Sequence, residues 1–423
     1  MAKTIVSQMA VERKRIEPSV KQYPASAADR PGNALVIADD IGIFLAIVRS
    51  LGRIGVTVDV AASISGQPGF ASRYIRDVHH VPSYLSHAAD WVAEVRKLCL
   101  AQPYDLIIPT SDSALALLDR HGAEFGTGQL ALPGAEALDL FSDKAICRDV
   151  ATKLGIAVAK GILLDRGSSP EAIIAQLGLP MICKPRRSFY LGDREDKQWA
   201  RIITEPEQLA EIIGNSPPNI MIAESFFHGD GIGVSVLANK GKIELAWQHR
   251  RLQAVSATGK SSIRKGEPVD RLLYQDVARL ADAVSLDGVA MFEFRHNSAA
   301  GSHILIEVNP RFWGSLPLAV AAGADFPAAL WRQSCGRQPV PGDIDYDMVK
   351  IDLSGEWGRV GSALKDKSAG HNRVRALHDL IGLISCLIWP RRVDSWADDD
   401  PAPFFEERKK ILGQLFRKFT NPR

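Results

Sequence analysis

The feature that most limits the fold is a change, near the middle of the chain, in how strands follow one another. In the first part, strand-like and helical runs alternate, and they are Asn33–Ala38, Ile41–Leu51, Gly55–Val60, Ala89–Leu100 and Tyr104–Pro109. Such β-α-β alternation predicts a parallel sheet with helices on both faces. We therefore expect a Rossmann-like α/β domain over residues 31–132.

The later strands are predicted to form a different kind of sheet. Met181–Pro185 and Asn219–Phe227 have strand composition, and they are followed by the apolar runs Gly231–Leu237 and Lys242–Trp247. The segment Asn239-Lys240-Gly241 between the last two runs is a good hairpin turn. Paired strands with helices between them predict an α+β fold for this half of the chain.

Size and charge limit the possible functions. A chain of 423 residues has room for two or three domains of roughly 100–200 residues each. A formal charge of +2 gives no electrostatic reason to expect binding to nucleic acid. Five widely spaced cysteines, an odd number, indicate reduced thiols and a cytoplasmic location.

The two ends of the chain carry no recognisable motif. Residues 1–30 lack the apolar core of a signal peptide, and their composition predicts a disordered tail. Residues 341–423 are expected to be a helical extension of unknown role. Their most apolar run, Leu380–Trp389, is too short to span a membrane and predicts a buried helix. The amphipathic end Glu406–Lys418 favours a packing helix over contact with a membrane surface or partner.

Two acidic side chains lie on the strands of a second predicted hairpin. The runs Val289–Arg295 and Ile304–Asn309 flank a polar turn, so pairing would set Glu293 beside Glu307. Asn309 would share a face with Glu307 because side chains alternate along a strand. Carboxylate and amide oxygens of this kind suit Mg²⁺ when phosphate and water complete its octahedron. Metal binding is favoured over a half-buried hairpin with salt-bridged acids.

Three further polar segments follow predicted strands. Arg311 could fork onto a phosphate or carboxylate. Thr110-Ser111-Asp112 favours a helix N-cap over a contact to a substrate amine. The first strand-to-helix turn contains Asp39-Asp40 in place of glycines, and two aspartates would repel a pyrophosphate. We therefore expect this domain to bind something other than a dinucleotide, at the carboxyl ends of its strands.

Taken in order, these motifs resemble the ATP-grasp superfamily, in its carboxylate–amine ligase branch. The resemblance covers most of residues 32–335 and rests on Asp143-Lys144, Lys184-Pro185, Glu224-Ser225-Phe226-Phe227, Glu293 and Glu307-Val308-Asn309-Pro310-Arg311. It implies a Rossmann-like pre-ATP-grasp domain followed by an ATP-grasp domain over residues 133–340. A lid subdomain would occupy residues 155–225, approximately.

The resemblance also implies a role for each motif. Lys144 and Lys184 would reach the phosphates of ATP. The hinge Glu224, Ser225, Phe226 and Phe227 would hold the adenine, and Asp230 would meet the ribose. Glu293, Glu307 and Asn309 would hold one or two Mg²⁺ (or Mn²⁺) ions. From the residues alone, each lysine could instead be a solvated surface group, and the two phenylalanines could be plain core.

The implied reaction is attack of a small-molecule carboxylate on the γ-phosphoryl group of ATP, followed by attack of an amine on the acyl phosphate. Arg311, Lys184 and either Arg250 or Arg251 would be the catalytic residues, although a solvated strand edge explains the latter pair equally well. Two alternatives stay open. One is a bicarbonate-using ligase of the carboxylase or carbamoyl-phosphate type, and the other is a non-catalytic ATP-binding regulator. A homodimer is possible.

Overall fold

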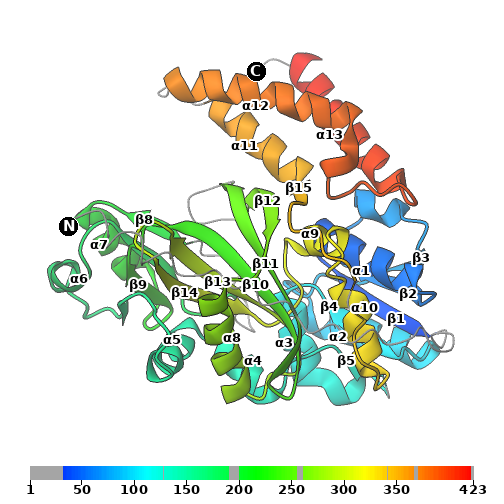
Figure 1. The fold of residues 1–423 in the computed structure, drawn as a ribbon, viewed down its shortest axis with the longest axis horizontal. Coiled ribbons are helices and arrows are strands. Elements are labelled where there is room, and N and C mark those ends of the chain that lie inside the picture. The colour runs from blue at the N-terminus through cyan, green and yellow to red at the C-terminus, as the bar shows by residue number, and fades with distance from the viewer. Residues whose placement is uncertain are drawn as a thin grey trace, which may run out of the picture.

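The computed structural model describes residues 32–126, 128–189, 200–254, 261–340, 342–365 and 370–420. The predicted tail, residues 1–30, lies outside these ranges. The described residues contain three sheets, and the largest of them lies between the other two (Figure 1). The mixed α/β and α+β fold class is confirmed.

The first sheet is parallel, as predicted, with strand order β3-β2-β1-β4-β5. Its strands are β1 Asn33–Ala38, β2 Thr57–Ala62, β3 Ile75–His80, β4 Leu106–Pro109 and β5 Gln129–Leu130. The helices and short 3₁₀ turns around it are α1 Ile41–Arg53, η1 Pro68–Ala71, α2 Ala88–Ala101, α3 Asp112–His121 and η2 Gly122–Glu124. Alternate residues of β1 belong to two different cores, because Val36 packs with α1 and Leu35 with α2 and α3. Helices therefore cover both faces.

The second sheet is antiparallel, with strand order β14-β13-β10-β11-β12-β15. Its strands are β10 Asp230–Asn239, β11 Lys242–Ala254, β12 Ser261–Glu267, β13 Gly288–Asn297, β14 Ser302–Asn309 and β15 Val349–Ile351. The helices against one of its faces are α4 Ala135–Ser142, α5 Lys144–Lys153 and α8 Arg271–Ala283. Phe292, Phe294 and Val308 point into that core. The neighbouring residues of the same strands therefore point to the other face.

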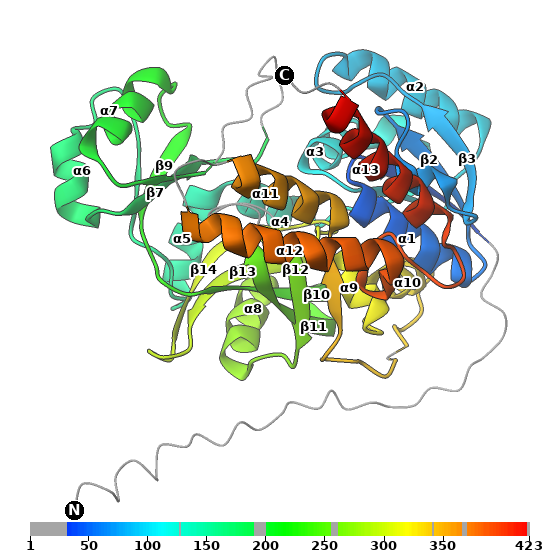
Figure 2. The same cartoon turned by 90° about the horizontal axis from the view of Figure 1, so that it is seen from above.

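The third sheet forms a small lobe at the left of Figure 1 and of Figure 2. Its strand order is β6-β9-β7-β8, with β6 Gly161–Leu163, β7 Met181–Pro185, β8 Arg201–Ile203 and β9 Met221–Ser225. Two helices pack against it, α6 Pro170–Leu177 and α7 Pro206–Asn215. The lobe occupies the region in which the resemblance places a lid.

The C-terminal segment forms a helical layer that contacts both larger sheets. Its elements, with the two helices before it, are α9 Leu316–Ala321, α10 Phe326–Ser334, α11 Leu353–Lys365, α12 Gly370–Ile388, η3 Pro390–Arg392 and α13 Ala402–Thr420. Phe404 and Ile411 of α13 are buried, as expected of a packing helix. Viewed from above, α12 and α13 lie over the central sheet and the α1 side respectively (Figure 2).

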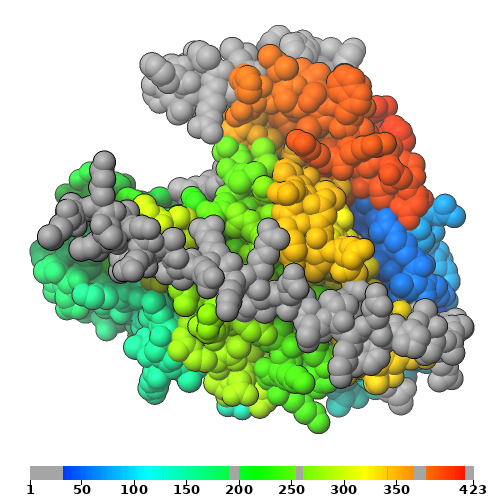
Figure 3. Space-filling model, viewed as in Figure 1, coloured from blue at the N-terminus to red at the C-terminus, as the bar shows by residue number. Residues whose placement is uncertain are grey.

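The prediction that Leu380–Trp389 is a buried helix is wrong in one respect. The segment is helical and Leu383 is buried, but Ile381 is 69% exposed, Ile388 61% and Trp389 72%. In Figure 3 the α12 helix lies near the top of the molecule, and its exposed side chains show that one face is open among the described residues. No helix among the described residues is both long and apolar enough to cross a bilayer.

Candidate functional site

The hairpin of β13 and β14 brings the two predicted acids together. Glu293 pairs directly with Glu307 across the two strands, and Met291 pairs with Asn309. Asn309 Nδ2 donates to Glu293 Oε1 at 3.3 Å. The prediction that the three side chains converge on one face is confirmed, because their neighbours Phe292 and Val308 point into the core on the opposite face.

A β-bulge beside this pair connects the hairpin to the small lobe. The register shifts after Glu293, where Phe294 pairs with Leu305, so Ile306 is an extra residue. Its carbonyl oxygen accepts a hydrogen bond from Lys184 Nζ at 3.1 Å. The Leu305 N–H donates to the carbonyl of Ala157 at 2.8 Å. The bulge therefore holds the acids next to the lobe.

Both predicted lysines lie at the site, and each is paired with a carboxylate. Lys144 is the first residue of α5, whose N-cap is Asp143, and its Nζ lies 3.5 Å from Glu307 Oε2. Lys184 is buried, and its Nζ lies 2.8 Å from Glu224 Oε2. Burial opposes ionisation of Glu307, but Lys144 and Lys184 outweigh it and lower the pKa of this carboxyl.

The predicted hinge lies where β9 leaves the small lobe. Glu224 is buried there, whereas Ser225, Phe226 and Phe227 are half-buried and lie outside the apolar cores. The Ser225 N–H donates to the carbonyl of Lys160 at 2.9 Å. The two aromatic rings are therefore partly open to a ligand.

Of the two arginines left open by the sequence, the structure brings Arg251 to the acids. Arg251 Nη2 lies 2.5 Å from Glu293 Oε2. Arg250 lies on the other face of β11, where it contacts Asp230 and Glu267, each at 2.6 Å. Asp230, predicted to meet a ribose, is exposed and holds this arginine. The sequence alone could have predicted that only one of the two arginines faces the acids, because consecutive side chains on a strand point to opposite faces.

A buried histidine that sequence reasoning missed completes this face. His249 is flanked by Gly233, where a Cβ would lie only 2.2 Å from the ring carbon Cε1. Burial lowers the pKa of His249, and the charges of Arg251 and Arg264 add to the effect. The imidazole is therefore neutral. The glycines at 231 and 233 were the available sequence clue, since a Cβ at Gly231 would likewise lie 2.9 Å from Arg251 Cδ.

Arg311 connects the hairpin to the parallel sheet. Its guanidinium donates to both carboxylate oxygens of Asp112, at 2.9 and 2.8 Å, and to Asn309 Oδ1 at 3.3 Å. Ser111 is the N-cap of α3, as predicted, and accepts from the Ala114 N–H at 3.1 Å. Asp112 therefore fixes the arginine that follows the Glu-Val-Asn-Pro motif, a contact across 199 residues of sequence.

The carboxyl ends of β1 and β4 also meet at this place. The Ser111 hydroxyl donates to Asp39 Oδ2 at 2.5 Å, and burial raises the pKa of Asp39. Asp40 caps α1 by accepting from the Gly42 N–H at 3.1 Å. The sheet order reverses between β1 and β4, which is where open α/β sheets bind ligands.

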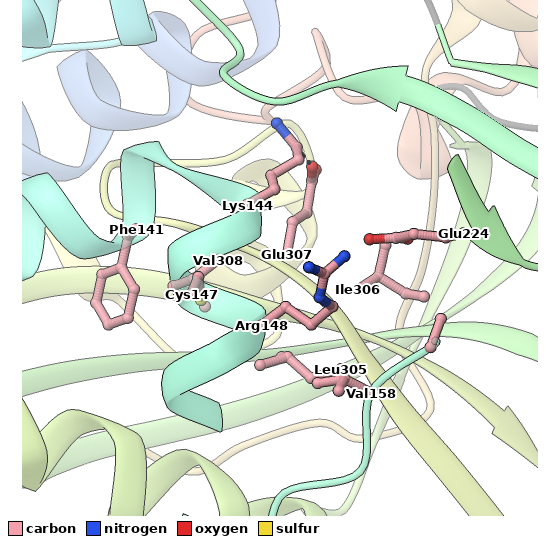
Figure 4. A pocket seen from close by; sticks show the side chains of 11 residues that line it. Phe141, Lys144, Cys147, Arg148, Val158, Glu224, Leu305, Ile306, Glu307 and Val308 are labelled. Carbon is pink, nitrogen blue, oxygen red and sulfur yellow. Dashed lines mark ion pairs between the residues drawn. The ribbon is translucent and has the colours of Figure 1, made fainter. Parts of the chain in front are cut away.

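A pocket opens between α4, α5, the segment just before β6, β9 and β14. Its lining includes Lys144, Arg148, Glu224, Ile306 and Glu307. In Figure 4, Lys144 and Glu307 point toward one another, while Arg148 and Glu224 both point into the space beside Ile306. One predicted phosphate residue (Lys144), one hinge residue (Glu224) and one metal ligand (Glu307) therefore border the same cavity.

The donor set suits magnesium bound together with a nucleotide. Within the described ranges, no group of three or more His, Cys, Asp or Glu side chains is arranged to hold a metal by itself. Glu293, Glu307 and Asn309 supply hard oxygen atoms, and the two acids lie beside cationic side chains. Mg²⁺ commonly takes one or two carboxylates and completes its shell with phosphate oxygens and water.

Comparison with known proteins identifies the fold. Residues 217–352 match the family model described as "ATP-grasp in the biosynthetic pathway with Ter operon". The similarity to this ATP-grasp family thus covers the segment from β9 to β15. A curated relative, N5-carboxyaminoimidazole ribonucleotide synthase of Vibrio parahaemolyticus serotype O3:K6 (strain RIMD 2210633), is 23% identical over 188 residues. That match covers 44% of this chain and 49% of the relative, so the chain spans about half the relative's length.

Solved ATP-grasp structures share the architecture at low sequence identity. The biotin carboxylase of Campylobacter jejuni superposes with a TM-score of 0.60 at 15% identity, covering 75% of this chain and 74% of that one. An N5-carboxyaminoimidazole ribonucleotide synthetase superposes with a TM-score of 0.59 at 16% identity, and the match covers 86% of this chain and 98% of that one. The L-amino acid ligase of Bacillus licheniformis superposes with a TM-score of 0.55 at 14% identity, and the match covers 74% of this chain and 76% of that one.

Proposed function

We propose that the protein is an ATP-dependent, ADP-forming ligase that activates a substrate carboxylate as an acyl phosphate for attack by an amine. The observation that carries this proposal is the convergence of Glu293, Glu307 and Asn309 beside Lys144 and Arg251. Acids that alternate with cations beside a cavity suit a metal–phosphate ligand. The ATP-grasp fold supports the same conclusion, since the similar proteins include an amino acid ligase and a carboxyaminoimidazole ribonucleotide synthase.

The nucleotide would lie in the pocket between the small lobe and β14. Lys144 and Lys184 would hold its phosphates, and the hinge after Glu224, with Ser225, Phe226 and Phe227, would hold its base. Asp230 is the candidate for the ribose, and reaching it would require Arg250 to release the carboxylate. Positioning of this kind supplies most of the catalysis in phosphoryl transfer.

Glu293, Glu307 and Asn309 would hold Mg²⁺ or Mn²⁺. When bound, the metal would neutralise charge on the β- and γ-phosphate oxygens. Lys144 and Arg251 pair with the same acids in the structure, at 3.5 and 2.5 Å. These cations would therefore be free to turn toward phosphate or substrate once the acids take up the metal.

In the first step, an oxygen of the substrate carboxylate attacks the γ-phosphorus, the bond to the β-phosphate oxygen breaks, and ADP leaves. In the second, the amine nitrogen attacks the acyl carbon and the bond to phosphate breaks. The amine proton passes to solvent or to the departing phosphate. Arg251 and Arg311 would grip the carboxylate and the acyl phosphate; their positions beside Glu293 and Asn309 support these roles.

The test is a matrix of carboxylates and amines, including bicarbonate, assayed for ADP and phosphate in the presence of Mg²⁺ and ATP. We expect release of both products only with a matching acid and amine. Activity with bicarbonate alone would instead indicate a carboxylase-type ligase. Tight ATP binding without turnover across the whole matrix would contradict catalysis and favour a regulatory protein.

A further inference from the structure

One half-buried cation that lines the pocket is only partly satisfied. Arg148 lies on α5, one turn after Lys144, and its side chain is 16% exposed. Its Nη2 contacts the exposed carboxylate of Asp149 at 3.3 Å. Its Nη1 is buried and has no hydrogen-bond partner within the described part of the chain. A buried N–H of a charged group without an acceptor is costly, so its position calls for a ligand or another partner.

The chain makes room for this guanidinium at a single glycine. Gly161 is the first residue of β6 and pairs with Glu224 of β9. A Cβ at position 161 would lie 2.0 Å from Arg148 Nη1, much closer than atoms can approach. The φ of Gly161 is not in the left-handed region, so the backbone itself does not require glycine. The close approach of the arginine is the physical reason for glycine here.

Arg148 lines the pocket on the side of the hinge. Figure 4 shows its guanidinium directed toward the space beside Ile306 and Glu224, whereas Lys144 reaches in the other direction toward Glu307. Lys144 is thus close to the proposed metal ligands, and Arg148 is close to the hinge. A donor at the hinge end of the pocket meets the base of a nucleotide sooner than its phosphates.

We infer that Arg148 is a nucleotide-binding residue whose free Nη1–H donates to an acceptor nitrogen of the purine base. This inference rests on the proposed function and deepens it. Adenine offers acceptor nitrogens on its ring edge, and arginine is a donor only. Bound nucleotide would therefore supply an acceptor for Nη1, which has none among the described residues.

The experiment compares the affinities of adenosine, ADP and ATP for the wild type and for Arg148→Met by calorimetry. We expect the dissociation constants of all three ligands to rise by the same factor of about ten, because the lost contact is to the base they share. Lys153→Met, an exposed cation later on the same helix, should leave all three unchanged. A rise for ADP and ATP with adenosine unchanged would show a phosphate contact and overturn the inference.

Two further measurements distinguish nucleotide binding by Arg148 from a purely structural role of this residue. The melting temperature of ligand-free Arg148→Met should stay the same or rise, since the variant removes an incompletely paired buried charge. A large fall would indicate a structural arginine and overturn the inference. Gly161→Ala should weaken adenosine binding as Arg148→Met does, and the double variant should bind no worse than the weaker single one.

Failure of the inference can be told from failure of the proposed function. If the wild type binds neither ATP nor ADP, the proposed ligase activity is wrong. If the wild type binds both normally and Arg148→Met does too, only the role of Arg148 is wrong. Additive losses in the double variant would also contradict it, because they would mean that position 161 acts independently of the arginine.

Discussion

Two groups of paired charges in this protein have opposite character. The first, which we call the ligand cluster, consists of Glu224, Glu293 and Glu307 with Lys184, Arg251 and Lys144. The second, the C-terminal clasp, consists of Asp399 and Asp400, which precede α13, with Arg49 and Arg53 of α1. Both groups join segments far apart in sequence. The first borders the pocket through Lys144, Glu224 and Glu307.

The difference is clearest between one carboxylate of each group, Asp400 and Glu307, and lies in how completely each is occupied. Asp400 is 1% exposed and accepts from Arg49 Nε at 2.9 Å, from Ser72 Oγ at 2.7 Å and from the Arg73 N–H at 3.0 Å. Glu307 is 27% exposed and lies 3.5 Å from Lys144, beyond ordinary hydrogen-bond distance. A saturated carboxylate stabilises the fold, whereas a loosely paired one can exchange its cation for a ligand. An ion pair alone therefore does not mark a binding site.

The largest effect is expected in the clasp. Asp400→Asn leaves the buried Arg49 without its charged partner, and breaking a buried pair costs about 3–5 kcal/mol. Urea denaturation should show this loss in the free energy of unfolding. At a temperature where the variant is folded, its affinity for ATP should equal that of the wild type. A loss of ATP affinity in folded Asp400→Asn would contradict the claim that the clasp serves the fold and not ligand binding.

The next effect is expected in the ligand cluster, on activity. Glu307→Gln removes a predicted metal ligand and should lower kcat by about 10²–10³-fold, the cost of one preorganised electrostatic group. Its melting temperature should fall only slightly, because the carboxylate is only loosely paired. Glu211→Gln, an exposed glutamate of α7, is the matched control and should keep full activity. Full activity in Glu307→Gln would remove Glu307 from the site.

Asp112→Asn sharpens the comparison because Asp112 combines a feature of each group: it is firmly bonded, like the acids of the clasp, yet partly exposed, like those of the ligand cluster. It holds Arg311 through two hydrogen bonds, yet it is 29% exposed. We expect the KM for the carboxylate substrate to rise about tenfold, while the KM for ATP stays constant, since Arg311 would lose its fixed orientation. Steady-state kinetics with each substrate varied in turn measure the two values. Equal rises in both would contradict a specific role for Arg311 at the carboxylate.

A smaller effect is the pH dependence of the ligand cluster. The pKa of Glu307 is lowered despite its burial, because Lys144 and Lys184 favour the ionised form. The resulting stability is present above the unfolded pKa of about 4.3 and is lost as the pH falls through the lowered folded pKa. The stability difference between wild type and Glu307→Gln should thus be constant at neutral pH and shrink in acid. A stability difference that grows in acid would contradict the lowered pKa of Glu307.

The smallest effect is expected for the exposed pair of the clasp. Arg53 and Asp399 are 38% and 40% exposed, and such pairs contribute about 0–1 kcal/mol. Asp399→Asn should therefore cost far less than Asp400→Asn in the same denaturation experiment, although the two acids are adjacent. Equal losses would mean that exposure does not separate the two contacts.

The sequence was sufficient to predict the local parts of the site. The pairing of Glu293 with Glu307 follows from a short turn and strand alternation, and the N-cap at Ser111 follows from residue type. The parallel order of the first sheet follows from its alternating elements. Each of these depends on residues that are close in sequence.

The rest depends on contacts that no local pattern encodes. The bulge at Ile306 and its hydrogen bond to Lys184 span 122 residues, and the bond from Arg311 to Asp112 spans 199. The choice of Arg251 over Arg250 required the register of β11 against its neighbours. The exposed face of α12 was missed because an apolar run predicts burial without showing how many faces have a partner.

The most direct test of the central claim is the fate of isotope from the substrate. The protein would be incubated with Mg²⁺, ATP and a pool of amines and carboxylic acids labelled with ¹⁸O, and the phosphorus products analysed by ³¹P NMR. Attack of a carboxylate on the γ-phosphorus predicts ADP and inorganic phosphate that carries one ¹⁸O atom. Formation of AMP and pyrophosphate, or of phosphate without label while the acid and amine are joined, would contradict the account.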